Sequence, residues 1–390
     1  MDPISHAASG AVALLTLKER PLHRFALPLA ALAAASPDVD IFFATGPLQF
    51  LLLHRGITHS LAALPLLGLL LACAARVLWR TDTPGRWTFA STWLFMCGMV
   101  GLHIWLDIVT TYGTMIFLPF SHERVRLNGL FIVDPLLTLP LLAGLAYAVK
   151  KSSRAAALAA FAWIFLWPGL GVALNSLHTA NVTARLAAQG REVEQVTVLP
   201  DALSPLFWRV LYSEAQIDAQ KGIRQTHVFE QALDAFGQEK GTALEHKAMP
   251  AELAEDLTRA STTCGYFLDF TVLPVLSPLR KQDIPVGPDA SQPQAKQSAS
   301  VDIPSKSFWL VRDLRFGTSL LFVRKLMAMR PNADIPFQLM VELIRDDSAK
   351  SGFALAGERL RFSDSGRDSG WQKPRTPGKI SFLNWLTGLR

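Results

Sequence analysis

The stretch that decides the fold is residues 87–106, WTFASTWLFMCGMVGLHIWL, which Asp107 follows directly. These twenty residues contain no Asp, Glu, Lys or Arg, and His103 is their one histidine. A helix of this length, at 1.5 Å per residue, reaches across the hydrocarbon core of a bilayer, about 30 Å. The stretch therefore predicts a transmembrane helix that ends in a histidine and a carboxylate.

Five further apolar segments surround this one within residues 1–174. They are residues 7–17, 25–44, 61–79, 129–149 and 155–174. Residues 155–174 are again twenty uncharged residues, whereas the eleven residues of 7–17 are short for a complete span. We expect residues 1–174 to form an all-α polytopic membrane domain of about six apolar helices.

Charge separates this region from the rest of the 390-residue chain. Residues 1–174 hold 12 Lys and Arg and 8 Asp and Glu, whereas residues 175–390 hold 26 and 24, which indicates a water-soluble domain. The net charge of +6 is too dilute for a nucleic-acid surface, so no nucleic-acid partner is expected. A composition of 50% hydrophobic residues excludes a disordered chain, and three cysteines exclude a disulfide framework.

Residues 175–390 are predicted to form one α+β domain. Alternating apolar residues indicate strands at 193–198 and 335–343, and helices are expected at 226–239 and 250–260. No catalytic motif stands out in this domain.

Two segments of the soluble domain are poor in apolar residues. Residues 281–305, with several prolines, glutamines and serines, predict a flexible stretch, and the glycine-rich residues 363–379 predict a polar tail.

Basic residues orient the predicted helices. Nine of the twelve Lys and Arg residues lie in alternate connections: Lys18, Arg20, Arg24, Arg76, Arg80, Arg86, Lys150, Lys151 and Arg154. The positive-inside rule places these connections in the cytoplasm. We therefore expect a multi-pass protein of the bacterial inner membrane, with both termini and the soluble domain on the outer, periplasmic side.

Histidines and aspartates collect at the predicted outer ends of the segments. The set is His6, Asp38, Asp40, His54, His59, His103 and Asp107. His103 and Asp107 are four residues apart and share one helix face, and imidazole with carboxylate is a usual zinc ligand pair. Asp38 and Asp40 follow Ser36-Pro37 and share a face if the chain stays extended there. Because ionisable groups are costly at membrane depth, a bound divalent metal, zinc by this ligand mix, explains the set most economically.

Several alternative roles for these residues stay open. A lone histidine near a membrane interface is more often hydrogen-bonded than metal-bound, and a proton relay also uses Asp and His chains. A structural metal site in a non-catalytic anchor or scaffold would be closed by four protein ligands. Ion transport would predict polar groups at the midplane, and a metalloprotease would need the absent His-Glu-x-x-His motif. Seven candidate ligands favour two or more ions, and so catalysis.

In a catalytic site, three residues would have roles other than binding metal. Asp38 or Asp40 is expected to accept the proton of an attacking water, and Arg55, between the two motif histidines, to bind phosphate. Arg124 and Arg126 lie on the same predicted side of the membrane. Pairing of these arginines with a nearby glutamate and with lipid head groups fits equally well.

The ordered motifs give residues 1–145 a resemblance to a known family. They are Asp2…His6, Ser-Pro-Asp38-Val-Asp40, His54-Arg-Gly-Ile-Thr-His59-Ser60, His103-x-x-x-Asp107-Ile-Val-Thr-Thr-Tyr-Gly, Pro119-Phe120-Ser121 and Asp134-Pro135-Leu-Leu-Thr. The set resembles the YdjM-like family of membrane-bound, predicted metal-dependent hydrolases. The resemblance implies a fold distantly similar to zinc-dependent phospholipase C, with the seven His and Asp residues as metal ligands or as groups that orient them.

We therefore expect a membrane-bound metal-dependent hydrolase that acts on a phosphoester of a lipid or lipid-linked substrate at the outer face of the inner membrane. The alternative is a non-catalytic membrane anchor or scaffold with a structural metal site.

Overall fold

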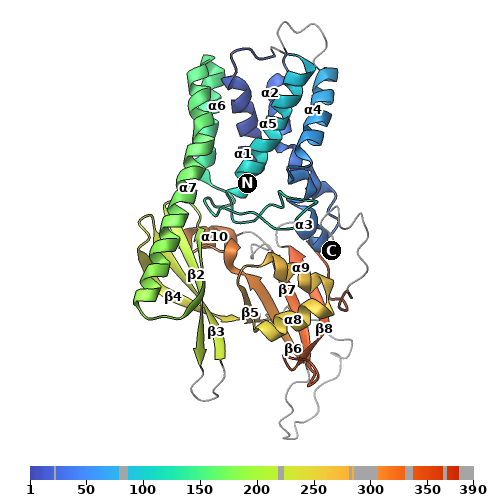
Figure 1. Ribbon diagram of the computed structural model, residues 1–390, viewed down its shortest axis with the longest axis vertical. Coiled ribbons are helices and arrows are strands. Elements are labelled where there is room, and N and C mark those ends of the chain that lie inside the picture. The colour runs from blue at the N-terminus through green and yellow to red at the C-terminus, as the bar shows by residue number, and fades with distance from the viewer. Residues whose placement is uncertain are drawn as a thin grey trace.

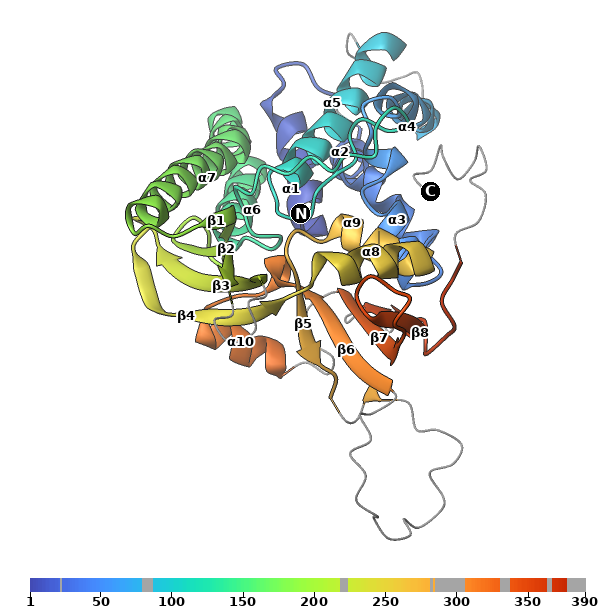
Figure 2. The ribbon, with the colours of Figure 1, turned by 60° about the horizontal axis from the view of Figure 1, so that its bottom comes forward.

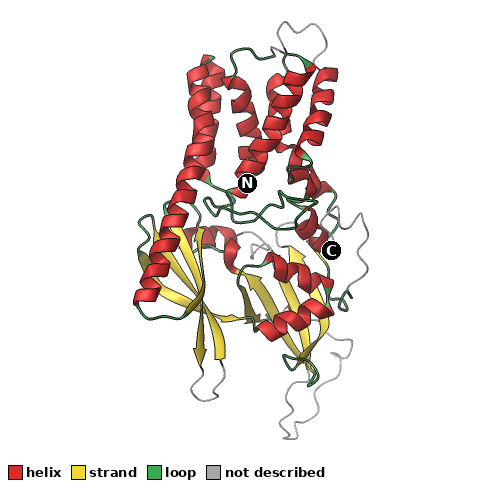
Figure 3. Ribbon diagram, viewed as in Figure 1, coloured by secondary structure: helices red, strands yellow, loops and turns green. Residues whose placement is uncertain are grey.

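The structure is a computed structural model that describes residues 1–21, 23–78, 87–217, 224–280, 283–284, 306–329, 337–362 and 367–376. Helices occupy one end of the molecule and a sheet the other, with loops between them (Figures 1 and 3). Apart from Asp283 and Ile284, the predicted flexible stretch 281–305 lies outside the described residues, as do residues 363–366 and 377–379 of the predicted tail.

The helical end is built from the N-terminal half of the chain. Its α-helices are α1 (Pro3–Thr16), α2 (Ala26–Ala35), α3 (Pro47–Leu53), α4 (Leu64–Leu78), α5 (Phe89–Ile108), α6 (Pro135–Lys151) and α7 (Arg154–Ala188), and its 3-10 helices are η1 (Ser36–Phe42) and η2 (Ile57–His59). Side-chain caps begin several of them. Thr88 accepts from the amide of Ser91 at the start of α5, and Asp134 accepts from Leu136 and Leu137 at the start of α6.

The structure supports two to three membrane spans rather than six. Within the described residues, α5 and α7 are long and apolar enough to cross a bilayer, and the pair 47–59 and 64–77, bent by 77°, makes a third if it is one span. All six predicted segments contain helix, but α1 and α2 have 14 and 10 residues and are too short to cross alone. The prediction of about six apolar helices is therefore borne out in part, since each segment contains a helix but only two to three of the described helices qualify as spans.

Small residues let the short helices pack closely. A Cβ on Gly10 of α1 would lie 2.2 Å from the carbonyl oxygen of Ala30 in α2, so the two backbones nearly touch. Ala30, Ala33 and Ala34 of α2 are buried in this contact region. Small residues at helix contacts are typical of helix packing in membranes, where dispersion contacts replace the hydrophobic effect.

The other end is a nine-stranded antiparallel sheet in which each strand pairs with the next along the chain. Its strands are β1 (Val193–Pro200), β2 (Phe207–Ile217), β3 (Arg224–Asp234), β4 (Glu239–Ala248), β5 (Pro274–Pro278), β6 (Lys306–Asp313), β7 (Phe337–Arg345), β8 (Phe353–Phe362) and β9 (Arg367–Asp368). Helices α8 (Ala251–Ala260) and α9 (Thr262–Phe270) lie beside the half that contains β5 to β8, and α10 (Leu321–Ala328) lies near β4 in the view of Figure 2.

The sheet domain agrees with most of the predicted elements. The strands at 193–198 and 335–343 correspond to β1 and β7, and the helix at 250–260 corresponds to α8. The helix predicted at 226–239 was wrong, because β3 occupies most of that range. A register shift between Glu230 and Ala232 interrupts the alternation of this strand, in which Val228, Gln231 and Leu233 are buried.

The two ends are joined through packed contacts as well as through α7. Helix α7 continues unbroken through residue 174 and its C-terminal part packs along β1. Phe50 of α3 stacks on Phe362 of β8, with ring centroids 4.5 Å apart, and both belong to the apolar core around β6 to β8. The side chain of Arg367 in β9 donates to the carbonyl oxygen of Ile41 in η1. The segments that carry the histidines and aspartates are therefore packed against the sheet domain.

Candidate metal centre

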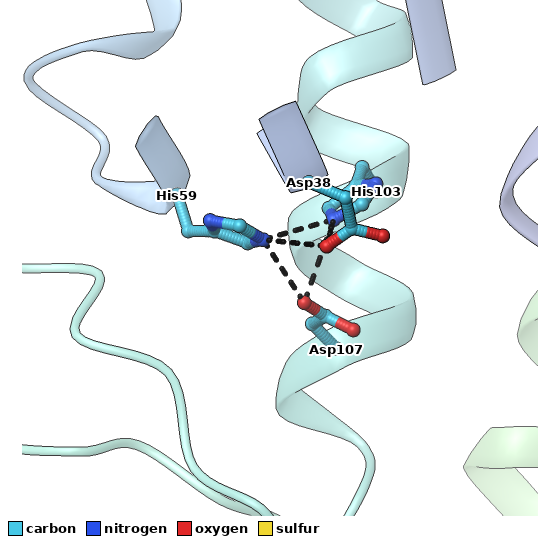
Figure 4. A group of neighbouring side chains, drawn as sticks. All are labelled: Asp38, His59, His103 and Asp107. Carbon is cyan, nitrogen blue, oxygen red and sulfur yellow. Dashed lines mark hydrogen bonds and ion pairs between the residues drawn. The ribbon is translucent and has the colours of Figure 1, made fainter. Parts of the chain in front are cut away.

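Four short elements bring the histidines and aspartates together at the end of the helical region that faces the sheet. Asp38 and Asp40 lie in η1, His54 follows α3, His59 ends η2, and His103 and Asp107 lie in the last turns of α5. Figure 4 shows Asp38, His59, His103 and Asp107 pointing toward one another. The i,i+4 spacing on α5 has the predicted effect, since His103 Nε2 lies 3.5 Å from Asp107 Oδ2.

The backbone of η1 differs from its predicted form. Ser36 was expected to be extended before Pro37, but its φ of −65° and ψ of −30° are helical, and η1 is a 3-10 helix. Asp38 and Asp40 nevertheless both reach histidines. Asp38 Oδ1 lies 3.5 Å from His59 Nε2, and Asp40 Oδ1 lies 3.0 Å from His54 Nδ1.

The turn between His54 and His59 is tightly constrained. Arg55 takes a φ of +59°, an unusual value for a residue with a side chain. A Cβ on Gly56 would lie 2.8 Å from the carbonyl oxygen of Leu53, so only glycine fits there without a shift. This turn directs the side chain of Arg55 inward and that of His59 onto α5.

Four ligand atoms converge in the buried part of the site. The Nε2 atoms of His59 and His103 are 3.0 Å apart, and His59 Nε2 lies 3.3 Å from Asp107 Oδ2. His103 Nε2 lies 3.6 Å from Asp38 Oδ1. Ligands bound tetrahedrally to zinc at its usual distances of 2.0–2.2 Å would be about 3.3–3.6 Å apart. The four His–Asp separations fall in this range, whereas the two Nε2 atoms, at 3.0 Å, are slightly closer than a tetrahedral ion would hold them.

Hydrogen bonds on the far side of each ring set which nitrogen faces the site. His103 Nδ1 lies 2.7 Å from the carbonyl oxygen of Ala34, which can only accept, so Nδ1 carries the proton. His59 Nδ1 lies 3.0 Å from the hydroxyl of Thr58, which donates its own hydrogen to Asp40 Oδ2 at 3.2 Å, so this hydroxyl accepts and His59 Nδ1 also carries the proton. Both Nε2 atoms then present lone pairs to the centre, as metal-binding histidines do.

The converging groups are therefore all acceptors. Two lone pairs and two carboxylate oxygens face one another in a buried space, and among the described residues Asp107 Oδ2 has no hydrogen-bond partner. Such a set is strongly repulsive without a cation between its members. The buried His/Asp group thus fits a divalent metal ion.

A second group of three ligands lies nearer the surface. Asp38, Asp40 and His54 each offer a ligand atom within 4.8 Å of the others, and Asp38 belongs to both groups. The side chains of Asp38 and His54 are 17% and 15% exposed, whereas His59, His103 and Asp107 are fully buried. The two groups therefore differ in access to solvent.

His6 lies beside these groups but in neither of them. Its ring stacks on that of His103 with centroids 3.7 Å apart, and its Nε2 lies 3.3 Å from Asp107 Oδ1, the carboxylate oxygen that faces away from His59. The amino group of Met1 contacts the same Oδ1 atom. His6 is therefore placed to support His103 and Asp107.

The guanidinium group of Arg55 is directed at Asp107. Its Nη2 lies 2.9 Å from Asp107 Oδ1, and its Nη1 donates to the Thr110 hydroxyl at 2.8 Å and to the Asp107 carbonyl oxygen at 3.1 Å. It also lies over the ring of Tyr112, 4.8 Å from the centroid. Arg55 is 2% exposed, so these contacts occupy it inside the protein.

Arg124, on the following loop, is also turned inward. It donates to the carbonyl oxygens of Leu51 and Gly113 at 2.8 and 3.2 Å, and burial lowers its pKa to about 10. Burial raises the pKa of Tyr112 to about 12, so its phenol stays protonated at neutral pH. Arg124 and Tyr112 thus shape the loop that runs beneath the site.

The sequence interpretation missed a brace that comes from the sheet domain. Arg315 is fully buried and donates to the carbonyl oxygens of Thr111 and Tyr112 at 3.3 and 3.4 Å. Its other contacts are a salt bridge to Asp313 and a hydrogen bond to the Phe270 carbonyl oxygen. The sequence contains both partners of this contact, in the Asp-Leu-Arg-Phe run at 313–316 and the Thr-Thr-Tyr run at 110–112. It gives no sign that the two runs contact each other.

Comparison with known proteins identifies the helical region. Residues 1–178 match the YdjM inner membrane protein family. The expected resemblance is thereby confirmed, and it covers the part of the chain that carries every candidate ligand. We refer to residues 1–178 as the YdjM region.

One curated relative is the uncharacterized protein YfhP of Bacillus subtilis (strain 168). It is 28% identical over 154 residues, which make up 37% of this chain. The match spans 46% of the length of YfhP, or about half. No solved structure matches the chain.

Proposed function

We propose that the protein is a membrane-bound, metal-dependent hydrolase that acts on a phosphoester of a lipid or lipid-linked substrate at the outer face of the inner membrane. The observation that carries the proposal is the pairing of two ligand groups through Asp38, one buried and one partly exposed. Catalytic zinc sites have three protein ligands and an open position, which the Asp38, Asp40 and His54 group offers. His59, His103, Asp107 and Asp38 would hold the inner ion.

Ions bound at these groups would lower the pKa of a bound water toward neutrality and would polarise a phosphoryl oxygen. The mixture of imidazole and carboxylate donors favours zinc. The protein's own residues divide the remaining tasks. Both oxygens of Asp40 are engaged, by His54 and by the amide of Arg55 and the hydroxyl of Thr58. Asp38 bridges the two ligand groups in this proposal, so it is not also free to accept the proton of the attacking water.

Arg55 holds Asp107 in this proposal and does not bind phosphate. Its contacts with Asp107 and Thr110 use both terminal nitrogens and leave neither directed at the exposed group. An arginine that orients a ligating carboxylate tunes metal affinity, and this is the role that its burial supports.

An apolar rim beside the exposed group supports a lipid substrate. Phe42 and Phe43, at the end of η1, are 81% and 69% exposed, and Val39 between the two aspartates is also exposed. Exposed aromatic side chains at the end of a membrane-embedded bundle are suited to contact lipid chains at the interface. A lipid bound there would place its head group near Asp38 and His54.

The arrangement of the loops supports the proposed orientation. The connections from α1 to α2 and from α6 to α7, both rich in Lys and Arg, lie at the end of the helical region far from the sheet (Figure 1). The positive-inside rule would place that end in the cytoplasm, and the candidate metal centre and sheet domain outside.

Metal stoichiometry and hydrolysis, measured on the same preparations, test the proposal. Full-length protein purified in detergent without chelators would be analysed by elemental mass spectrometry and assayed on phosphatidic acid and phosphatidylglycerol micelles. We expect two ions in wild type, loss of one ion and of hydrolysis in His54→Ala, and loss of metal in His103→Ala/Asp107→Ala. His23→Ala, in the connection between α1 and α2, is the matched control and should change neither. Metal-loaded protein that hydrolyses no phosphoester would contradict the proposal.

A structural metal site in a membrane anchor is the second candidate. The observation that favours it is that His59, His103, Asp107 and Asp38 already make four ligands, which is the closed set of a structural zinc. This candidate predicts one ion, unchanged by His54→Ala, and a lower unfolding temperature after chelation.

A further inference from the structure

A cavity with basic walls lies at the opposite end of the helical region from the candidate metal centre. It is an open pocket with a volume of about 240 Å³, bordered by the end of α1, the connection to α2 and the end of α6. Its apolar lining includes Leu14, Leu15 and Leu27, and its polar lining includes Arg20, His23 and Arg24. The cavity therefore combines an apolar floor with a cationic rim.

The surroundings of the cavity are strongly cationic. Among the described residues, the connections from α1 to α2 and from α6 to α7, with the helix ends beside them, carry six Lys and Arg residues against one acidic residue, Glu19. Arg20 and His23 are half-buried, and the guanidinium of Arg24 lies 4.6 Å from the centroid of the Phe25 ring. An anion in the cavity would gain from these charges and from partial exclusion of water.

We propose that this cavity binds the phosphate head group of an anionic phospholipid, with an acyl chain along the apolar floor. Guanidinium groups bind phosphate oxygens in a bidentate manner, and basic cavities between membrane helices are known sites for anionic head groups. The apolar lining by Leu14, Leu15 and Leu27 favours a lipid over free phosphate, which has no chain to bury. This proposal is independent of the hydrolase proposal, because no candidate metal ligand lines the cavity.

Native mass spectrometry of the full-length protein with added lipid tests the assignment. The probes are phosphatidylglycerol, zwitterionic phosphatidylcholine and inorganic phosphate. The test variant is Arg20→Gln/Arg24→Gln. The matched control is Lys150→Gln/Lys151→Gln, which removes the same charge from exposed positions at the same end of the helical region.

We expect phosphatidylglycerol to bind more tightly than phosphatidylcholine, and its affinity to fall about tenfold in Arg20→Gln/Arg24→Gln but less than about twofold in the lysine control. Equal losses in the two double variants would overturn the proposal, because they would show a general effect of surface charge. Displacement of the lipid by millimolar inorganic phosphate would assign the cavity to free phosphate instead.

Arg20→Lys/Arg24→Lys keeps the test decisive if the glutamine variant does not fold. Lysine retains the charge but loses the planar fork, so an affinity between those of wild type and the glutamine variant is expected. An affinity equal to that of wild type would overturn the role given to the guanidinium groups.

Discussion

Replacing Arg55 separates its two assigned roles, holding Asp107 and binding phosphate. The guanidinium makes a buried ion pair with Asp107 Oδ1 at 2.9 Å and two hydrogen bonds, to the Thr110 hydroxyl and the Asp107 carbonyl oxygen. Arg55→Met removes all three and leaves the amino group of Met1 as the remaining cationic contact of Asp107 Oδ1. Removing one partner of a buried ion pair costs about 3–5 kcal/mol, part of which would appear as weaker metal binding.

The size of the effect follows from what Arg55 does for a ligand. Groups that orient a ligating side chain change metal affinity by about 10–100-fold when removed. We expect Arg55→Met to weaken zinc binding toward the upper end of that range. Arg55→Lys should fall nearer the lower end, since lysine restores the charge but cannot reach Asp107 and Thr110 together.

Zinc affinity would be measured by competition with a chromogenic chelator on full-length protein in detergent. Arg126→Lys is the matched control, because Arg126 lies on the same predicted side and lies outside both ligand groups. Zinc affinity in Arg55→Met equal to that of wild type would refute the positioning role, and a selective rise in KM for a phosphoester would then restore the phosphate-binding hypothesis.

Three further predictions concern the framework around the site. Arg315→Met should destabilise the protein by about 3–5 kcal/mol, because it leaves the carboxylate of Asp313 buried without its ion-pair partner. Adding Asp313→Asn to this variant should recover part of the lost stability, and urea unfolding would measure both effects. Burial raises the pKa of Glu230, but the hydrogen bond to His246 and the charge of Arg209 outweigh burial and lower this pKa to about 2. The contribution of Glu230 to folding stability is therefore fully present above about pH 4.5 and is lost as the pH falls toward 2. Glu230→Gln should therefore flatten the acid limb of the stability curve. Gly10→Val should separate α1 from α2 and lower the unfolding temperature, since its side chain has no room.

Each of these three predictions can be contradicted by a specific measurement. An additive effect of the Asp313 and Arg315 changes would contradict a coupled buried pair, and an unchanged acid limb in Glu230→Gln would contradict the role of that carboxyl. Unaltered thermal unfolding in Gly10→Val would contradict the close backbone approach. Gly98, whose Cβ position is open, provides the control, and Gly98→Val should have a much smaller effect.

Local patterns in the sequence predicted the helices and most of the candidate site. The spacing of His103 and Asp107 is a short-range signal, and it survives in the structure because one helix sets it directly. Interactions between distant segments were not predictable in this way. The contact of Arg315 with Thr111 and the stacking of Phe50 on Phe362 depend on how the sheet packs against the helices, and the inward course of Arg55 depends on its contacts with Asp107 and Thr110.

Local misjudgements have a similar origin. Hydropathy joined α2 and η1 into one apolar segment, although the helix type changes at Ser36. A register shift in β3 interrupts the alternation that marks a strand in the sequence, although β3 forms a regular ladder with β2. In both cases the apolar residues were identified correctly, but the backbone geometry that presents them is decided by tertiary contacts.

The brace from Arg315 to Thr111 sets the order in which the molecule can be completed. The two residues are 204 positions apart, and the bond closes across the boundary between the helices and the sheet. A nascent chain that has just released α5 from the ribosome already carries His54, His59, His103 and Asp107, yet the loop below them lacks its support until residue 315 has been synthesised and folded. The loop is therefore completed late in biogenesis, on the side of the membrane where the sheet folds.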